Sequence, residues 1–339
     1  MVTLTRTLQI PPEAQQVAAA IRDGKRFLMV PHINIDGDDL GCMIGLALAL
    51  RELDKEVYLY SPDQVPQRFH YMPGHELVSQ TLPEGHFDAI FVLECPEIGR
   101  LPQGIDPHKM ADIVITLDHH IDSPGRTRFV GDINWVDAGM SALGEMIAEV
   151  LIELNIPISR AAAIALYTSI ITDSNAFRYH GVTPRTHLLA AHLLESLDPS
   201  DTDTIHFNAL ASRTAAEKAL AALCTKTLKF RAEGRIAYCD LTSAMLEEAG
   251  IAEEDTQMLL PDLNNLQGVE IFALFKTTTP GCVRVSLRAH NVPVVKVAGK
   301  HGGGGHSLAA AMKVSDADLE SLRAQILDEL EALLQEERG

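Results

Sequence analysis

The sequence predicts an α/β protein in which an N-terminal doubly wound, mostly parallel sheet domain precedes a smaller mixed α+β domain. Over the first 200 residues, short β-branched runs alternate with longer apolar stretches, a pattern typical of a parallel sheet covered by helices. Beyond this part, strand patterns dominate until a closing helix. A chain of 339 residues also exceeds the usual size of one hydrophobic core, so two domains are expected.

The N-terminal elements are predicted from apolar runs bounded by polar residues. Strands are expected where a run is short and β-branched, and helices where it is longer. Asp38 or Asp39 is expected to cap the first of these helices, because an acidic N-cap accepts hydrogen bonds from free backbone N–H groups. The predicted strands cover residues 27–30, 57–60, 89–93 and 113–117, and the predicted helices cover 40–53, 141–154, 160–172 and 184–197.

The segment Asp198-Pro199-Ser200-Asp201 marks the expected boundary between the domains. The first domain is therefore predicted to span residues 1–198, followed by a helical connector over 199–223. The second domain is predicted to span 224–339, with strands at 227–230, 236–240, 269–275 and 283–288 and a helix over 318–336.

Charge is distributed unevenly along the chain. The net charge of −18 argues against broad binding of long duplex nucleic acid, which needs many Lys and Arg contacts to phosphates. Residues 271–315 nevertheless contain no Asp or Glu and carry +6, which leaves −24 on the remainder. A local cationic patch on an acidic protein favours a small anionic ligand.

Targeting and redox features indicate a cytoplasmic protein. The N-terminus lacks the pattern of a signal peptide, and no apolar stretch reaches the ~18 residues of a membrane span. The five cysteines are odd in number and never form a Cys-x-x-Cys pair. This spacing argues against a disulfide framework or a thiolate zinc site, and for a reducing compartment.

Polar groups that can bind metal follow several predicted strands. Asp118, His119 and His120 directly follow the strand at 113–117, and Glu94 follows the strand at 89–93. Ligands of open parallel sheets bind just beyond the carboxyl ends of the strands. A carboxylate after an apolar run is costly to bury unless it is paired or bound to metal. Each residue could instead be an ordinary polar loop or turn residue, but their joint placement favours a site.

Two further segments complete the candidate metal centre. His32, Asp36 and Asp38 lie in the glycine-containing loop after the first strand, and Asp173 follows the helix at 160–172. Oxygen-rich ligation with imidazole favours Mn²⁺ or Mg²⁺, and two such ions are the usual apparatus for phosphoryl displacement. His120 is then available to contact a phosphate, and Asp118 to orient its neighbours. The predicted metal ligands are His32, Asp36, Asp38, Glu94, His119 and Asp173.

The run from Gly302 to Gly305, followed by His306, lies inside the acid-free window. Glycine runs are usually flexible linkers, but here apolar segments flank the run on both sides. Glycine lets backbone N–H groups approach a phosphate closely, so we expect a phosphate or nucleotide cradle. Arg288 and Arg284, on one predicted strand, are expected to bind the same anion.

These motifs resemble the DHH phosphoesterase superfamily with its DHH-associated C-terminal domain. The resemblance is carried by His-x-x-x-Asp-x-Asp at 32–38, an acidic strand end, Asp-His-His at 118–120, Thr-Asp-Ser at 172–174 and Gly-Gly-Gly-Gly-His at 302–306. The compact layout is similar to the oligoribonuclease and pAp phosphatase (nanoRNase) branch. The family usually has Asp at the bridging position, whereas this chain has Glu94.

The resemblance implies a role for each matching residue. His32 and Asp36 would bind one Mn²⁺, and Asp38, His119 and Asp173 a second, with Glu94 bridging both. Mg²⁺ and Co²⁺ are the alternative ions. His120 would contact the scissile phosphate with Asp118 beside it, while the far end of a nucleotide would bind across the cleft between the domains. The residues implied there are Arg284, Arg288, Gly303, Gly304, Gly305 and His306.

The resemblance therefore implies a dinuclear Mn²⁺-dependent hydrolase. Its expected substrates are short oligoribonucleotides, cleaved to mononucleotides, and 3′-phosphoadenosine 5′-phosphate (pAp), dephosphorylated to AMP. The alternatives are a phosphodiesterase for cyclic or linear dinucleotides, and a nucleotide-binding sensor whose catalysis is impaired at Glu94. The expected partners are short RNA or small nucleotides, without long duplexes or membranes, and a homodimer stays open.

Overall fold

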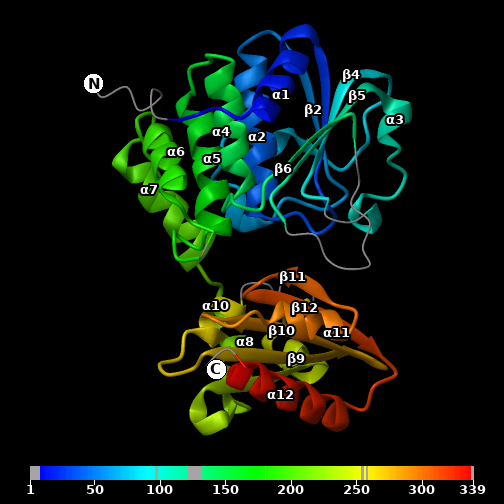
Figure 1. Ribbon diagram of the computed structural model, residues 1–339, viewed down its shortest axis with the longest axis vertical. Helices are drawn as coiled ribbons and strands as arrows, with labels where there is room; N and C mark the ends of the chain where they lie inside the picture. The colour runs from blue at the N-terminus through cyan, green and yellow to red at the C-terminus, as the bar shows by residue number, and fades with distance from the viewer. Residues whose placement is uncertain are drawn as a thin grey trace. The chain divides into compact units, whose positions relative to one another are not determined.

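The computed structural model describes residues 8–95, 98–120, 131–179, 181–252, 256 and 259–336, without the side chains of Pro261, Asp262 and His306. The chain divides into two compact units, Met1–Ser212 and Arg213–Gly339, each built on a six-stranded sheet (Figure 1). The first sheet is wholly parallel and the second is mixed, which confirms the predicted fold class.

The first sheet has the strand order β3-β2-β1-β4-β5-β6. Successive strands run outward from β1 to one edge and then outward from β4 to the other edge. The order therefore reverses between β1 and β4, and parallel sheets bind ligands at the carboxyl ends of the strands at such a switch point. The strands are β1 Arg26–Val30, β2 Glu56–Tyr60, β3 Val78–Ser79, β4 Phe87–Leu93, β5 Ala111–Asp118 and β6 Ile133–Val136.

Helices α1, α2, α4 and α5 cover one face of this sheet and share its largest buried core (Figure 1). Helices α2 and α5 are apolar on most sides and pack closely on each other. A Cβ atom at Gly41 would lie 2.4 Å from the backbone oxygen of Ala165, so only glycine permits this approach. A smaller core lies on the opposite face. The helices of this unit are α1 Pro12–Asp23, α2 Gly37–Arg51, α3 Pro107–Met110, α4 Leu143–Glu153, α5 Arg160–Asp173, α6 Pro184–Leu194 and α7 Pro199–His206.

The first predicted helix begins three residues earlier than expected. Its N-cap is Asp36, whose side chain accepts hydrogen bonds from the backbone N–H groups of Asp38 and Asp39, so the expectation that either of those residues is the cap is wrong. The first residue of α2 is consequently Gly37. The structure also contains short elements that the sequence pattern did not predict, among them α1, α3, β3 and β6.

The second unit has the strand order β11-β12-β10-β9-β8-β7. Only β8 and β9 pair in parallel among its described strands. Helices α8, α9 and α10 pack on one face of this sheet, while α11 and α12 pack on the other. The elements are α8 Ala215–Lys226, β7 Lys229–Arg231, β8 Ile236–Thr242, α9 Ser243–Ala249, α10 Leu259–Asn264, β9 Ile271–Thr279, β10 Cys282–Ala289, α11 Val295–Lys300, β11 Gly304–His306, β12 Ala309–Ser315 and α12 Leu319–Glu336.

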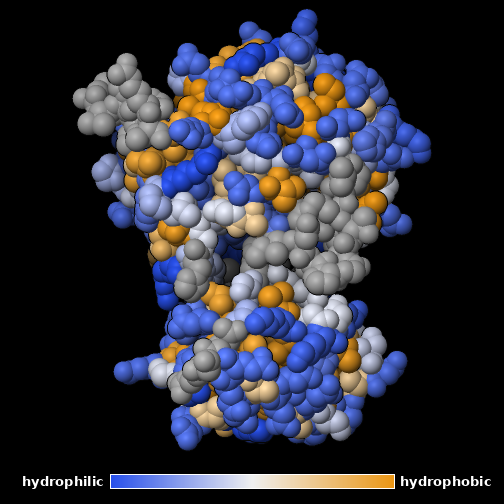
Figure 2. Space-filling model, viewed as in Figure 1, coloured by the Kyte–Doolittle hydropathy of each residue, from blue (hydrophilic) through white to orange (hydrophobic). Residues whose placement is uncertain are grey.

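Short 3₁₀-helical and π-helical turns lie between these elements. The 3₁₀ turns are η2 Gln67–Phe69, η3 His75–Leu77, η4 Ile98–Arg100 and η6 Ala232–Gly234, and η5 Phe207–Ala211 is a π-helical turn. Hydrophobic residues on the surface shown in Figure 2 occur in small patches separated by hydrophilic ones. Among the described residues, no helix is both long and apolar enough to traverse a lipid bilayer.

Candidate metal centre

The metal-binding candidates gather at the carboxyl end of the first sheet. His32 follows β1, Glu94 follows β4 and His119 follows β5, and these strands are neighbours in the sheet. The helix termini of α2 and α5 supply the remaining carboxylates. Overlapping groups have one ligand atom from each member within 4.8 Å of the others: Glu94, His119 and His120; His32, Asp36, Asp39 and Glu94; and Asp38, His119 and Asp173.

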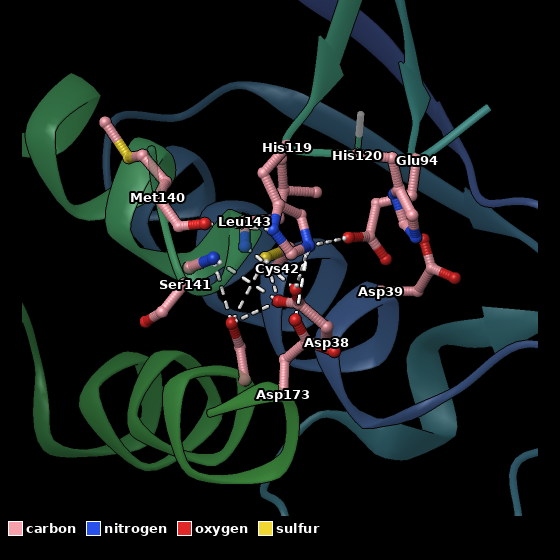
Figure 3. Close-up of polar contacts among 12 residues, drawn as sticks. Asp38, Asp39, Cys42, Glu94, His119, His120, Met140, Ser141, Leu143 and Asp173 are labelled. Carbon is pink, nitrogen blue, oxygen red and sulfur yellow. Dashed lines mark hydrogen bonds and ion pairs between the residues drawn. The ribbon is translucent and has the colours of Figure 1, made fainter. Parts of the chain in front are cut away.

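The imidazole of His119 lies at the centre of the cluster. Its Nδ1 donates a hydrogen bond to the backbone oxygen of Met140 at 3.2 Å, which leaves Nε2 facing the carboxylates (Figure 3). Nε2 lies 2.8 Å from Glu94 Oε1, 3.3 Å from Asp173 Oδ2 and 3.4 Å from Asp38 Oδ2. Burial opposes the charged imidazole, but the carboxylates of Asp173, Asp38 and Glu94 together raise the pKa of His119 well above 6.5.

Asp38 is held by hydrogen bonds from two helices. The backbone N–H of Leu143, at the start of α4, donates to Oδ2 at 2.8 Å, and the Ser169 hydroxyl on α5 donates to Oδ1. Burial acts to raise the pKa of Asp38, but His119 and these hydrogen bonds lower it below its usual value. Asp38 is therefore a carboxylate that stays ionised in a buried position.

His32 presents one ring nitrogen to a second group of carboxylates. Its Nδ1 donates to the backbone oxygen of Ile33 at 2.8 Å, so in the neutral ring Nε2 keeps its lone pair. Nε2 lies 4.0 Å from Asp36 Oδ2, whose other oxygen caps α2. Burial lowers the pKa of His32 to about 4, so the ring is neutral at pH 7 and suited to bind a metal.

Glu94 belongs to two of the groups and lies between them. It has the positive φ of 49°, which is uncommon for a residue with a side chain and is enriched at functional sites. Burial, followed by the charge of Asp38, raises its pKa well above the usual value. A carboxylate held in this environment has a strong tendency to bind a cation or a proton.

Asp173 is the last residue of α5 and not part of a separate turn. A carboxylate there faces the negative end of the helix dipole, which disfavours its charge. Burial and the nearby acids raise the pKa of Asp173 to about 8, although His119 opposes this shift. The chain leaves the helix through Asn175, Ala176 and Phe177, all with positive φ.

His120 and Asp118 form a separate pair beside the cluster. The backbone N–H and the Nδ1 of His120 both lie within 2.9 Å of Asp118 Oδ1, and Nδ1–H donates to this oxygen. Asp118 is buried, whereas His120 is partly exposed. This arrangement fixes the orientation of the His120 ring.

The donor set fits divalent metal ions on grounds of local chemistry. Within the described residues, both oxygens of buried Asp39 lack a hydrogen-bond partner. The pKa values of Asp39, Glu94 and Asp173 are all raised, because burial and mutual repulsion disfavour their charges. Bound cations would offset both costs, and carboxylate oxygens with neutral imidazoles suit hard or borderline ions such as Mg²⁺ and Mn²⁺.

Asp39 is a residue of the cluster for which the sequence pattern predicted no role as a metal ligand. It was expected only as a helix cap, yet its Oδ2 lies 3.3 Å from His32 Nδ1 and it joins the His32 group. The available sequence signal was two adjacent acids, Asp38 and Asp39, after Asp36-Gly37. Because neighbouring residues at a helix start point in different directions, one can face each group of ligands.

The cationic residues of the second unit form a row across its sheet. Arg284 on β10 is paired with Lys276 on β9 and with Lys313 on β12, so all three lie on one sheet face. This face is opposite α12, because Val283, Val285 and Leu287 of β10 belong to the core beneath that helix. Like charges directly opposite each other are unfavourable unless an anion binds there.

Arg288 lies further along the same face of β10 and is partly exposed. It lines a small pocket together with residues of α10 and β9 and the end of β10: Asn264, Val269, Glu270, Phe272, Ala289 and His290. The predicted substrate residues Arg284 and Arg288 therefore share a face, with Arg288 in the more recessed position.

The glycine run forms an edge strand of the second sheet. Gly304 and Gly305 pair with Ala311 and Ala310 of β12. A Cβ atom at Gly303 would lie 2.3 Å from the Ala311 oxygen, so the run requires glycine for close strand contact. The pairing leaves one edge of β11 without a neighbouring strand in the described sheet. The side chain of predicted ligand His306 lies outside the described residues.

Two family models match the chain and together span most of it. Residues 26–170 match the N-terminal domain of the DHH family, and residues 234–336 match the DHHA1 domain. The first match contains the ends of β1, β4 and β5, and the second contains the glycine run and Arg288. The chain belongs to the DHH family, with a DHH domain followed by a DHHA1 domain.

Within this family, the chain is similar to bifunctional oligoribonuclease and PAP phosphatase NrnA. The Thermus thermophilus protein of that name is 29% identical over 304 residues, which cover 88% of this chain and 86% of the relative. The probable NrnA of Streptococcus mutans is also 29% identical and covers 87% of this chain and 91% of the relative. The NrnA of Bacillus subtilis is 24% identical over 308 residues, which cover 90% of this chain and 93% of the relative.

A solved structure shows the same fold. The crystal structure of an exopolyphosphatase-related protein from Bacteroides fragilis matches with a TM-score of 0.82 and covers 95% of this chain and 97% of that chain. Its sequence identity is 19%, so the match concerns the fold alone.

Proposed function

We propose that this protein is a dinuclear Mn²⁺-dependent phosphoesterase that hydrolyses short oligoribonucleotides to mononucleotides and dephosphorylates pAp to AMP. The observation that carries this proposal is the position of Glu94, which belongs to both the His119 and the His32 ligand groups. The names of the NrnA relatives, which share both domains over most of their length, support the substrate class.

The metals would be held in two groups. His32 and Asp36 would bind one ion, and Asp38, His119 and Asp173 the other, with Glu94 shared. Bound divalent ions neutralise charge on the phosphate and lower the pKa of bound water. The protein holds both imidazoles with Nδ1 donating to backbone oxygens. Nε2 of His119 then faces three carboxylates, and Nε2 of His32 lies 4.0 Å from Asp36 Oδ2.

The remaining residues would bind and orient the phosphate. His120, fixed through Nδ1 by Asp118, would use Nε2 to contact a non-bridging oxygen of the scissile phosphate. Hydrolysis adds the elements of water: the attacking oxygen bonds to phosphorus, and the departing ribose oxygen takes a proton. His120 lies close enough to Glu94 and His119 to act on the same phosphate.

The second unit would bind the other end of the nucleotide. Arg288 and Arg284 present guanidinium groups on one face of β10, and guanidinium binds phosphate through paired hydrogen bonds. Gly303, Gly304, Gly305 and His306 would contact the same end through the edge strand β11. Small substrates with a terminal phosphate fit this cationic face better than long duplexes.

The proposal is tested by hydrolysis of a 5′-labelled RNA dinucleotide and of pAp, assayed separately with Mn²⁺, Mg²⁺ or Co²⁺. We expect turnover of both substrates, highest with Mn²⁺ and abolished by EDTA. The variant His119→Ala should lose about a thousandfold in kcat, the scale seen when a group acting directly on the transition state is removed. The matched control is Asp112→Asn, a strand residue whose side chain is 70% exposed.

Other results would contradict the proposal. Binding of pAp without turnover, unchanged in His119→Ala, would identify a nucleotide sensor. Turnover of a cyclic dinucleotide with no turnover of the RNA dinucleotide or pAp would identify the phosphodiesterase alternative. Full activity in EDTA would exclude the metal-dependent mechanism.

A further inference from the structure

Asp39 has a buried carboxyl group that none of the described residues hydrogen-bonds. Its side chain is 0% exposed, and within the described part of the chain neither carboxylate oxygen accepts a hydrogen bond. Buried polar groups in folded proteins are nearly always hydrogen-bonded, and buried charges are paired or bound to metal. Asp39 therefore needs a partner that the described residues do not supply.

A role as a helix-terminal acid does not account for this position. Asp39 lies in the first turn of α2, where an acidic residue interacts favourably with the helix dipole. However, Asp36 already accepts the hydrogen bonds of the first free N–H groups. A carboxylate can interact with the helix dipole while it is exposed to water, so this interaction does not require burial. Asp39 is fully buried.

A role as the orienting partner of His32 is also insufficient. Asp39 Oδ2 lies 3.3 Å from His32 Nδ1, but the proton on Nδ1 is donated to the Ile33 oxygen at 2.8 Å. Among the described residues, the strongest charges acting on Asp39 are those of Glu94, Asp36 and Asp38, which repel it, and that of Arg100, which attracts it. One cation facing three acids leaves the group short of positive charge.

We propose that Asp39 is a metal ligand, forming with His32, Asp36 and Glu94 a site of three carboxylates and one imidazole for a hard divalent cation. One ligand atom of each of these four residues lies within 4.8 Å of the others. Figure 3 shows Glu94 and Asp39 on the same side of the cluster, away from Asp38 and Asp173. This inference rests on the proposed function, because it concerns one of its two metal positions.

The assignment gives the two metal positions the same number of carboxylates. The His32 group has the carboxylates of Asp36, Asp39 and Glu94, and the group around His119 has those of Asp38 and Asp173 besides the shared Glu94. Affinity for hard cations rises with the number of charged oxygen ligands. Without Asp39 the His32 position would have only two carboxylates, so replacing Asp39 should weaken the binding of the ion held there.

The test is Mn²⁺ titration of metal-free protein, followed by calorimetry and by the electron paramagnetic resonance signal of free Mn²⁺. We compare the wild type with Asp39→Asn, which removes the charge and keeps the shape, and with Asp112→Asn as the matched exposed control. Asp39→Asn should raise the Kd of one of the two Mn²⁺ ions at least tenfold, equivalent to about 1.4 kcal/mol. The control should leave this Kd unchanged.

Thermal unfolding separates ligation from a structural role. Removing an unpartnered buried charge should leave the Tm of metal-free Asp39→Asn equal to or above that of the wild type, while the rise in Tm on adding Mn²⁺ becomes smaller. A purely structural aspartate would give a lower metal-free Tm and an unchanged Mn²⁺ affinity, which would overturn the inference. Asp39→Ser serves as a second variant if Asp39→Asn does not fold.

Failure of this inference can be distinguished from failure of the proposed function. Wild-type turnover with Mn²⁺, together with wild-type Mn²⁺ affinity in either folded Asp39 variant, would exclude Asp39 as a ligand and leave the function standing. A wild-type protein that binds no Mn²⁺ would overturn both.

Discussion

The charged side chains of the metal centre and of the cationic row lie in different environments, mostly buried in the first unit and more exposed in the second. In the first, most of the acids and imidazoles of the metal centre are buried near the ends of adjacent parallel strands, and His119 and Asp38 are oriented by specific backbone or side-chain groups. In the second, Arg284, Lys276 and Lys313 stand in a row across an antiparallel sheet face, with Arg284 and Lys313 exposed. The first arrangement fixes positions, and the second supplies an electrostatic surface.

This difference sets how each unit should respond to substitution. A buried charge depends on its neighbours, because removing one partner leaves the others unsatisfied in a low-dielectric environment. An exposed cation interacts through solvent and contributes a small, salt-dependent amount. Single changes near the metal centre should therefore have large effects, while single changes on the cationic row should have graded ones.

Among changes to residues that would touch neither metal nor substrate, the largest effect is expected for Ser169→Ala, which removes a support of Asp38. The Ser169 hydroxyl donates to Asp38 Oδ1 and accepts from the Gly144 N–H at 2.9 Å. Alanine therefore removes one hydrogen bond from a buried acceptor, Asp38, and one from a buried donor, the Gly144 N–H. Loss of groups that orient metal ligands typically costs 10–100-fold in metal affinity or activity, and we expect a loss of about that size. The measurement is kcat as a function of Mn²⁺ concentration with pAp as substrate.

The matched control is Ser196→Ala in the same unit. The Ser196 hydroxyl also donates one hydrogen bond, to the Ile158 oxygen at 2.9 Å, but this bond lies just before the start of α5, whereas Asp173 is at the other end of that helix. It should change Tm slightly and leave the Mn²⁺ dependence intact. Equal kinetics in the two variants would show that Asp38 does not depend on Ser169.

The sequence predicted the parts of the centre that follow from the strand pattern. His32, Glu94 and His119 each follow an apolar run, and a parallel sheet brings the carboxyl ends of such runs to one edge. The support of Asp38 could not be predicted in this way. Ser169 is 131 residues from Asp38 in the chain, and it resembles any other serine in an apolar helix until α2 and α5 are packed.

The helices and strands with long apolar patterns were also predictable from the sequence, whereas their exact ends and the glycine-rich strand were not. Long periodic segments such as α5 and α12 were located well, because their apolar patterns extend over several turns. The start of α2 was placed late, since Asp36, Asp38 and Asp39 are all acceptable caps and only the backbone decides among them. Strand β11 was not predicted, because glycine has low strand preference and forms a strand here through close pairing with β12.

An effect of similar size, but confined to KM, is expected on the cationic face, where Arg288→Ala tests substrate binding. A hydrogen bond to a charged group contributes about 1.5–3 kcal/mol, so KM for pAp should rise about 10–100-fold while kcat changes little. Lys313→Ala on the same face should raise KM only a few-fold, and less at high salt. The measurement is the full kinetic profile at two salt concentrations.

Lys229→Ala is the control for this pair of variants. Lys229 is exposed on β7, the edge of the sheet opposite β11, and its removal should alter neither constant. A fall in kcat at unchanged KM for Arg288→Ala would mean that Arg288 acts on the reacting phosphate. The clear division of roles between the two units would then be lost.

The smallest effect concerns the stability of the metal-free protein as pH changes. Burial and neighbouring acids raise the pKa of Asp173 to about 8 and raise those of Glu94 and Asp39, so the folded state binds more protons than the unfolded state between about pH 4 and 8. Stability should then fall as pH rises through this range. His119, with its raised pKa, acts in the same direction.

One group opposes this trend. Burial lowers the pKa of His32 to about 4, so between pH 4 and 6.5 its unfolded form binds the extra proton and favours unfolding on acidification. The net expectation is a Tm that rises by a few degrees from pH 8 to pH 6.5 in EDTA, since a change of about 1 kcal/mol shifts the Tm of a large domain by a few degrees. With saturating Mn²⁺ the ligands stay ionised and this dependence should disappear. A Tm in EDTA that falls over the same interval would show that the carboxylates do not repel one another as their burial indicates.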